Sequence, residues 1–351
     1  TAPQGVSGFF DCDDREAWLD HIASLPGGYV PERHGTRLPP IAKASDRCLP
    51  ARSRILSPDA ELSDMFLIEG ERGCHRMCSF CVMRRTTNGG MRLVTPERIT
   101  DYVPEMARKV GLVGAAISDH PQLIPLLETL VAQGKSVSLS SLRADRIARK
   151  PAIAQLLRTS GARTLTVASD GASERLRRTI AKNTRSDDLR ACAALAGELG
   201  YAVFKVYMIV GLPDETDDDI DELIAFTNEL DALAGGTRVA LGVAPLVAKR
   251  NTPLDGAPFA GISAVDKRLK RLRKGLRRSV ELRPTSARWA WVEHELSQGG
   301  PEVGEALYAA HQAGGRFADV KRALRAVDPA TRRPWATVEP PVPLRERRRA
   351  R

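Results

Sequence analysis

The chain contains 351 residues, 42% of them hydrophobic, and has a formal net charge of +10 at neutral pH. A chain of this length can bury one substantial core and a smaller appendage, and no apolar run approaches the length needed to cross a bilayer. The composition therefore argues against a membrane-spanning protein. Six cysteines without the spacing of a disulfide framework predict a cytoplasmic protein.

The positive charge is concentrated in two short segments. Residues 266–283 contain nine Lys or Arg against two acidic residues, and residues 345–351 contain five Arg against one Glu. These segments carry the whole excess, so the remaining chain is close to neutral. The charge therefore permits RNA as a partner without demanding it.

Residues 1–60 show little periodicity. A short helix is expected near residues 14–24, and a passage rich in Pro, Gly and Arg follows it. We interpret this region as an arm or linker that leads into the core.

From residue 65 onward, strand-like and helix-like segments alternate. The expected strands are 65–69, 112–117, 137–142, 164–169, 203–210 and 239–244. The expected helices are 96–109, 121–133, 151–159, 173–181, 187–199 and 217–230. This alternation predicts an α/β fold with a parallel sheet covered by helices, and six such units fit a partial (βα)6 TIM-like barrel over residues 61–255. In such barrels the chemistry lies at the carboxyl ends of the strands.

A helical extension is expected over residues 256–333, followed by a disordered basic tail over 334–351. The first helix of the extension is predicted from an apolar stripe with strongly basic residues on its other faces. We favour a helix packed on the barrel with a solvated charged face, and binding of RNA or an acidic substrate is the alternative. The stripe consists of Val265, Leu269, Leu272, Leu276 and Val280.

Three cysteines, Cys74, Cys78 and Cys81, follow the first expected strand in a CxxxCxxC spacing. Three soft thiolates so close together suit an iron–sulfur cluster or zinc. A closed zinc site needs four ligands, typically as two pairs, and no second CxxC pair is present. A zinc site that uses His75 as its fourth ligand and unrelated buried thiols stay open as alternatives. The other cysteines, expected to be structural or incidental, are Cys12, Cys48 and Cys192.

The cysteine motif, with the aromatic Phe80 directly before Cys81, resembles the signature of radical S-adenosylmethionine (SAM) enzymes. Residues 164–182 and 203–216 are similar to stretches of one branch of that superfamily. This branch contains the methylthiotransferases, the Elongator-type radical proteins and the cobalamin-dependent methyltransferases. The nearest relatives by this resemblance carry an N-terminal cobalamin-binding domain, which we expect upstream of Thr1.

The resemblance implies a [4Fe–4S] cluster held by the three cysteines, with one iron free to chelate SAM. Reductive cleavage of SAM then gives a 5′-deoxyadenosyl radical that functionalises an unactivated carbon. Cobalamin-dependent methyl transfer is the expected reaction, with a flavodoxin- or ferredoxin-type electron donor. The substrate is unknown, with RNA, a small molecule and a peptide as candidates. A radical SAM enzyme that modifies RNA or transfers methylthio groups without cobalamin, and a non-catalytic metal- or RNA-binding protein, are the alternatives.

Residues in loops after the expected strands are predicted to contact SAM. Arg or Lys can pair with its carboxylate, Asp or Glu with its ribose, and a glycine turn with its adenine. Asp170 departs from the family pattern, because relatives commonly have Glu there, and its shorter side chain puts the ribose contact in question. Lys205 lies in a buried-looking strand, so a carboxylate partner is expected for it. The predicted contacts are Phe80, Ser118, Ser141, Arg143, Asp170, Lys205 and Gly211.

Several of these loop residues have simple structural interpretations. Asp119 could cap the helix that follows it. His120, before a proline, is expected to be a turn or packing residue. Arg143 and Asp145 could form a surface ion pair, and Thr216 with Asp219 predicts a capped helix start after the glycine turn.

Overall fold

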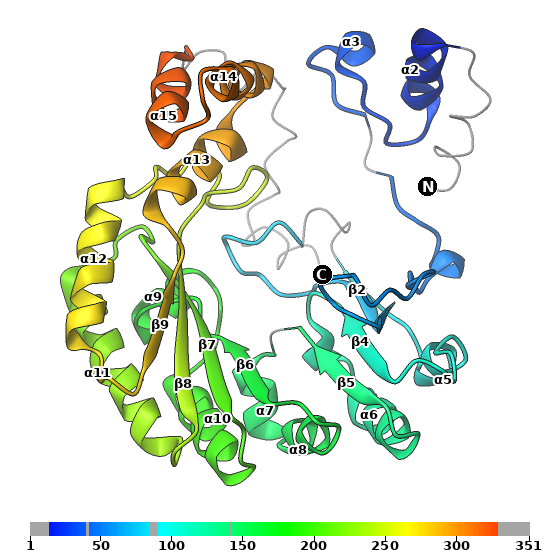
Figure 1. The fold of residues 1–351 in the computed structure, drawn as a ribbon, viewed down its shortest axis with the longest axis vertical. Coiled ribbons are helices and arrows are strands. Elements are labelled where there is room, and N and C mark those ends of the chain that lie inside the picture. The colour runs from blue at the N-terminus through cyan, green and yellow to red at the C-terminus, as the bar shows by residue number, and fades with distance from the viewer. Residues whose placement is uncertain (1–13, 40–41, 84–89, 141, 329–351) are drawn as a thin grey trace, which may run out of the picture.

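The computed structural model describes residues 14–39, 42–83, 90–140 and 142–328. Its centre consists of two parallel sheets whose strands follow one another in chain order (Figure 1). The first sheet contains β1 (Met65–Glu69), β4 (Lys109–Val113) and β5 (Ser136–Leu139). The second contains β6 (Thr164–Ala168), β7 (Val203–Val210), β8 (Arg238–Pro245) and β9 (Glu281–Pro284).

A parallel bridge between Leu142 and Val167 joins the two sheets. The strands therefore form one open arc, and among the described residues β1 and β9 do not pair with each other to close it. This arrangement confirms the predicted α/β fold with parallel strands. The helices that cover the arc are α5 (Pro96–Thr100), α6 (Leu123–Ala132), α7 (Ala144–Arg149), α8 (Ala152–Thr159), α9 (Glu174–Thr179), α10 (Ser186–Glu198) and α11 (Asp217–Leu233), with the 3-10 turn η2 (Ile117–Asp119).

The main core lies between the strands and these helices. Alternate strand residues point outward beneath the helices and are buried, as the period of two in a strand requires. They include Phe66, Ile68, Val110, Leu112, Phe204 and Val206. The other face of each strand points to the inside of the arc, and in β1, β6 and β7 it is less buried.

The region between the first two expected strands differs from the prediction. The helix expected over 96–109 ends at Thr100, and β4 begins at Lys109 rather than at 112. Pro104 explains the early end, because a proline disfavours a helical residue before it and has no backbone N–H.

A short antiparallel hairpin was also not predicted. It pairs β2 (Glu71–Gly73) with β3 (Met91–Leu93) and carries the cysteine segment between its strands. The cysteines therefore follow β2 rather than β1 directly.

The expected helical extension contains a strand as well as helices. Its helix α12 (Ile262–Gly275) buries Val265, Leu269 and Leu272, but the helix ends at Gly275. The prediction that Leu276 and Val280 continue this helix was wrong, because the chain turns there to add β9 beside β8. The segment then forms α13 (Ala287–Gln298), α14 (Pro301–Gln312) and α15 (Phe317–Ala326), which share a small core of their own.

The basic face of α12 lies against the acidic first turns of α11. Arg271 pairs with Asp221 at 2.5 Å, and Lys267 lies 3.4 Å from Asp217. Arg268 reaches Glu215 at 3.1 Å. These pairs support the interpretation of α12 as a helix packed on the barrel.

The N-terminal arm forms α2 (Arg15–Ser24), α3 (Pro31–His34) and the turn η1 (Asp46–Cys48). The α2 helix matches the expected one, with Asp14 accepting the N–H of Ala17 as its cap. In Figure 1, α2–α3 and α13–α15 lie on opposite sides above the strands. The predicted basic tail, 334–351, lies outside the described residues, and no helix in the described ranges is long and apolar enough to span a bilayer.

Candidate active site

The three cysteines lie on the loop that leaves β2. Gly73, the last residue of β2, has φ +97°, a backbone conformation that favours glycine. Cys74, Cys78 and Cys81 are all partly buried, and none forms a disulfide. Figure 1 shows β2 of the hairpin above β4 of the first sheet.

The first half of the cysteine loop is held by the carboxylate of Asp119, whose side chain is completely buried. Arg76, between the first two cysteines, donates to both oxygens of Asp119 at 2.8 and 2.6 Å. Arg146 of α7 donates to the same carboxylate at 2.5 Å, and His75 Nε2 lies 3.7 Å from it. Burial alone would raise the pKa of Asp119, but these arginines lower it overall. The carboxylate therefore stays charged and ties the loop to η2 and α7.

The interpretation of Asp119 as a helix cap was wrong. Asp119 is the last residue of η2, and the cap position of α6 is Gln122, which makes no side-chain cap bond. The sequence contained one usable signal for the actual role, a cationic residue inside the CxxxC spacing that requires a partner. It did not indicate which carboxylate would supply that partner.

The second half of the loop contacts the second sheet. The N–H of Ser79 donates to the carbonyl of Ile180 at 3.0 Å, and the N–H of Leu254 donates to the carbonyl of Ser79 at 3.3 Å. Phe80 packs against the main core. The loop thus connects the first sheet to segments that follow α9 and β8.

Burial raises the pKa of the Cys74 and Cys78 thiols. Two contacts oppose this effect: the N–H of Arg76 donates to Cys74 Sγ at 3.4 Å, and the positive charge of Lys182 acts on Cys78. Within the described ranges, no three Cys, His, Asp or Glu side chains converge closely enough to form a ready-made metal site.

The donor set nevertheless suits an iron–sulfur cluster better than zinc. It consists of three free thiols on one anchored loop. His75, the candidate fourth zinc ligand, is 49% exposed and lies toward Asp119. The three cysteines are therefore the residues that would hold a cluster.

Two predicted SAM contacts lie together near this loop. The N–H of Arg143 donates to Ser118 Oγ at 3.2 Å, and both residues are buried. Arg143 Nε lies 2.9 Å from Asp145 Oδ1, but the pair lacks hydrogen-bond alignment, so each atom is left without a hydrogen-bond partner. The expectation of a surface pair was wrong, because both side chains are less than 10% exposed. Ser141 lies outside the described residues.

Asp170 and Gly211 follow the carboxyl ends of β6 and β7 in left-handed conformations, with φ values of +62° and +82°. The Asp170 carboxylate forms an ion pair with Lys182, and both side chains are mostly buried. The N–H of Gly211 donates to Glu215 Oε1 at 2.8 Å, which closes the glycine turn on itself. The capped helix start was confirmed, because Thr216 and Asp219 form a capping box at α11.

Lys205 lies on the strand that leads to Gly211, six positions before it. It is the third residue of the eight-residue strand β7, on the inner face of the arc. Its Nζ donates to the hydroxyl of Tyr207 at 2.8 Å rather than to a carboxylate. The N–H of Asp170 donates to the carbonyl of Tyr207 at 3.1 Å, so Asp170 contacts the same part of β7. Within the described residues, the hydrogen bond of Lys205 goes to a hydroxyl, and a carboxylate partner for it stays a prediction.

Sequence reasoning missed Glu71, which is 1% exposed and directly precedes the cysteine loop in β2. Its Oε1 accepts the N–H of Ala116 at 2.6 Å, and Oε2 has no hydrogen-bond partner. Burial raises its pKa to about 7. A Cβ at Gly114 would lie 2.4 Å from this carboxylate, so glycine is required for the contact. His120 is buried as expected, with Nε2 3.0 Å from the carbonyl of Val94.

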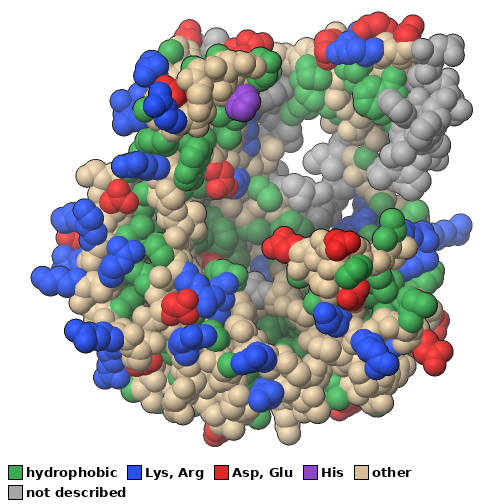
Figure 2. Space-filling view, viewed as in Figure 1, with side chains coloured by type: hydrophobic (Ala, Val, Ile, Leu, Met, Phe, Trp, Pro, Cys, Tyr) green, Lys and Arg blue, Asp and Glu red, His purple; other side chains and the backbone are tan. Residues whose placement is uncertain are grey.

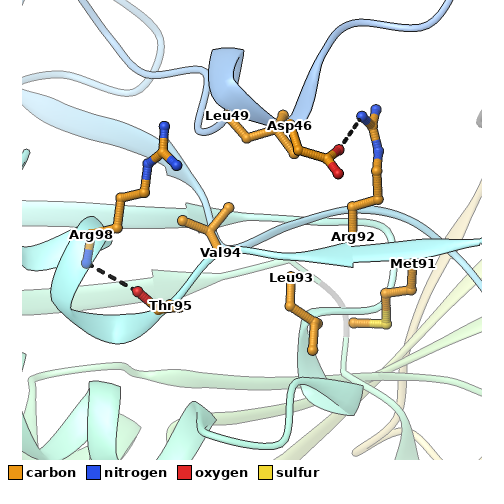
Figure 3. Close-up of a pocket in the computed structure, with 8 residues that line it drawn as sticks. All are labelled: Asp46, Leu49, Met91, Arg92, Leu93, Val94, Thr95 and Arg98. Atoms are coloured by element: carbon orange, nitrogen blue, oxygen red, sulfur yellow. Dashed lines mark hydrogen bonds and ion pairs between the residues drawn. The ribbon is translucent and has the colours of Figure 1, made fainter.

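A pocket of about 390 Å³ lies beside β3, at the junction between the hairpin and the N-terminal arm (Figure 3). Arg92 donates to the carbonyl of Ala44 and to Asp46 at 2.7 and 2.8 Å, and Arg98 donates to the carbonyl of Arg47. These arginines fasten the arm to the hairpin. None of the predicted cluster or SAM residues lines this pocket.

Comparison with known proteins identifies the domain that carries this site. Residues 68–227 match the family model of the radical SAM superfamily. The chain contains a radical SAM domain. An uncharacterized protein of Methanocaldococcus jannaschii is 31% identical over 233 residues, which is 63% of this chain. The chain spans about half (49%) of that relative's length.

Solved structures of radical SAM enzymes align with the chain at low identity. SuiB of Streptococcus suis bound to S-adenosylmethionine is 13% identical, with 63% of this chain and 50% of SuiB covered and a TM-score of 0.47. The cobalamin-dependent radical enzyme OxsB is 14% identical, with 74% and 44% covered and a TM-score of 0.43. Methylornithine synthase (PylB) is 14% identical, with 73% and 84% covered and a TM-score of 0.38.

Proposed function

We propose that this radical SAM protein cleaves S-adenosylmethionine reductively and uses the product to functionalise an unactivated carbon. The observation that carries the proposal is the anchored loop with three free thiols, inside the segment that matches the superfamily. Cys74, Cys78 and Cys81 would hold a [4Fe–4S] cluster. When bound, that cluster supplies the electron that breaks a carbon–sulfur bond of SAM.

The described residues have separate tasks in this proposal. Asp119 and Arg76 hold the first half of the loop that carries the thiols in place. Arg143 supplies a buried cation, with one guanidinium nitrogen lacking a hydrogen-bond partner, that can meet the SAM carboxylate. Asp170 is the candidate ribose partner, and its carboxylate would then bind the ribose and Lys182 together.

Anaerobic reconstitution with iron and sulfide tests the proposal directly. With dithionite and SAM, the wild type should produce 5′-deoxyadenosine, and Cys78→Ala should produce none while keeping its fold. Cys48→Ala is the matched control, since Cys48 is exposed and remote from the loop in sequence, and it should behave as wild type. Stoichiometric zinc with no 5′-deoxyadenosine would instead support the non-catalytic metal-binding alternative.

We further propose cobalamin-dependent methyl transfer as the reaction class. The resemblance of residues 164–182 and 203–216 to a branch with cobalamin-dependent members supports it. Methylthiolation is disfavoured because that chemistry needs an auxiliary cluster with its own cysteines. Cys48 is exposed, whereas Cys192 is fully buried with its thiol 3.5 Å from the carbonyl of Ala144, so these two do not form a second ligand set.

Product analysis with added cobalamin tests the reaction class. The full-length protein should retain cobalamin through gel filtration and form S-adenosylhomocysteine together with 5′-deoxyadenosine. Formation of 5′-deoxyadenosine alone, unchanged by cobalamin, would contradict methyl transfer and leave SAM cleavage standing. The electron donor of the flavodoxin or ferredoxin type is part of the same proposal, and replacing dithionite with such a protein tests it.

A further inference from the structure

The inner face of the second sheet is polar and open. Along β7, Phe204 and Val206 are buried beneath the helices, whereas Lys205 and Tyr207 point inward and Tyr207 is 40% exposed. Parallel barrels normally fill this interior with layers of bulky, branched side chains. The second sheet instead leaves the inward side chains of Tyr207 and Arg283 accessible to a ligand.

Strand register places the polar residues in two adjacent layers. One layer consists of Thr166, Lys205, Ala240 and Glu281, and the next of Ala168, Tyr207, Gly242 and Arg283. Small residues therefore flank the charged and aromatic ones. A Cβ at Gly242 would lie 3.1 Å from the Tyr207 ring, so this glycine lets the ring lie close to β8.

Cations outnumber acids in these layers. Arg283 donates to both oxygens of Glu281 at 2.8 Å, and Arg238 lies 3.7 Å from the same carboxylate. Lys205 Nζ donates to the Tyr207 hydroxyl at 2.8 Å and lies 4.4 Å from the ring centroid. Among the described residues, two arginines thus share the Glu281 carboxylate while Lys205 forms no ion pair, and Figure 2 shows Lys and Arg side chains gathered around an acidic one over β7–β9.

We propose that Lys205, Tyr207 and Arg283 bind an anionic group, a carboxylate or a phosphate, of the substrate. Lys205 and the guanidinium of Arg283 would supply charge-assisted donors, and the Tyr207 hydroxyl would orient the anion. The partly exposed side chains of this cluster allow it to exchange its present partners for a ligand. The assignment to the substrate rests on the proposed function, whereas the anion site itself does not.

Position along the strand argues that this anion is not the carboxylate of SAM. Lys205 precedes Val210, the last residue of β7, by five positions, or about 16 Å along the strand. The cysteine loop bonds to Ile180 and Leu254, which follow α9 and β8, on the carboxyl side of the strands. The cluster therefore lies deeper in the arc than the site for the iron–sulfur cluster.

Equilibrium dialysis of the full chain with inorganic phosphate, and separately with succinate, tests the site and distinguishes the two anion classes. The preferred probe should bind saturably, and Lys205→Met or Arg283→Met should weaken it about tenfold. Glu281→Gln should tighten binding, because it removes the competing carboxylate. Lys267→Met, which deletes one charge from a side chain that is 74% exposed on α12, is the matched control and should have no effect.

Four outcomes would overturn the proposal. The first two are that neither probe binds saturably and that Lys267→Met loses as much probe affinity as Lys205→Met. The third is that Glu281→Gln binds the probe more weakly rather than more tightly. The fourth is that Lys205→Met loses affinity for SAM but not for the probe. If Lys205→Met fails to fold, Arg283→Met provides the same test, because Arg283 is exposed on the edge strand β9 and its replacement should leave the fold intact. Cys78→Ala should keep probe binding while losing SAM cleavage. Probe binding without any 5′-deoxyadenosine in the wild type would refute the proposed function and leave the anion site standing.

Discussion

Replacing Asp119 tests whether the buried carboxylate organises the cysteine loop. Asp119→Ala removes three hydrogen bonds from Arg76 and Arg146 and leaves both guanidinium groups without their anion. Breaking a buried ion pair costs about 3–5 kcal/mol. The arginine side chains are 24% and 29% exposed and can partly rehydrate, so we expect the low end of this range, about 3 kcal/mol.

Part of that loss should appear locally, in the loop that must bind iron. Asp119→Ala should therefore lower the iron and sulfide content after reconstitution, measured chemically and by visible absorbance, in addition to its effect on urea unfolding. Asp119→Asn keeps the size and one acceptor oxygen, so it should fall between the alanine variant and the wild type.

The matched control is Asp221→Asn on α11. Asp221 pairs with Arg271 on the surface, and exposed pairs contribute at most about 1 kcal/mol. This control should load iron as the wild type does. Full iron loading in Asp119→Ala, together with an unfolding free energy equal to that of the control, would refute the role assigned to Asp119.

Three further predictions follow from single positions. The folded-state pKa of Glu71 is raised to about 7, so the free energy of unfolding of the wild type should fall by up to about 3 kcal/mol as the pH rises from about 4.5 to 7. Urea unfolding at pH 5 and pH 8 should show this loss, and Glu71→Gln should abolish it. An equal loss in the variant would disprove the assignment. Cys192→Ala should lower stability by about 1 kcal/mol because it removes a fully buried thiol, and iron content equal to wild type is required if Cys192 is purely structural. Gly242→Ala should push the Tyr207 ring away from β8 and weaken the binding of phosphate or succinate, while it lowers the free energy of unfolding by at most about 1 kcal/mol. Unchanged probe affinity would count against a role of the Tyr207 ring in the anion site.

Local patterns in the sequence predicted the alternating elements well where the signal was strong. The strands at 65–69 and 203–210 agree with β1 and β7 because their alternate residues are apolar enough to fill one face of a sheet. The capping box at Thr216 was readable for a similar reason, since it depends on residues only three positions apart. Between 96 and 117 the same reasoning failed, because Pro104 and the contact of Glu71 with Ala116 set the boundaries.

The cysteine spacing was likewise a local signal, and by itself it indicated which thiols belong together and that they suit an iron–sulfur cluster or zinc. Only the tertiary structure decided what holds that loop, because Arg76 and Asp119 are 43 positions apart and their pairing depends on how η2 and α7 meet the hairpin. The same holds for the layer in which Lys205 lies, because strand register with β8 and β9 places Ala240 and Glu281 beside it, whereas its hydrogen-bond partner Tyr207 is two residues away on the same strand. Ligand type follows from side-chain chemistry, which the sequence states directly, whereas the partners of a buried charge follow from packing between distant segments.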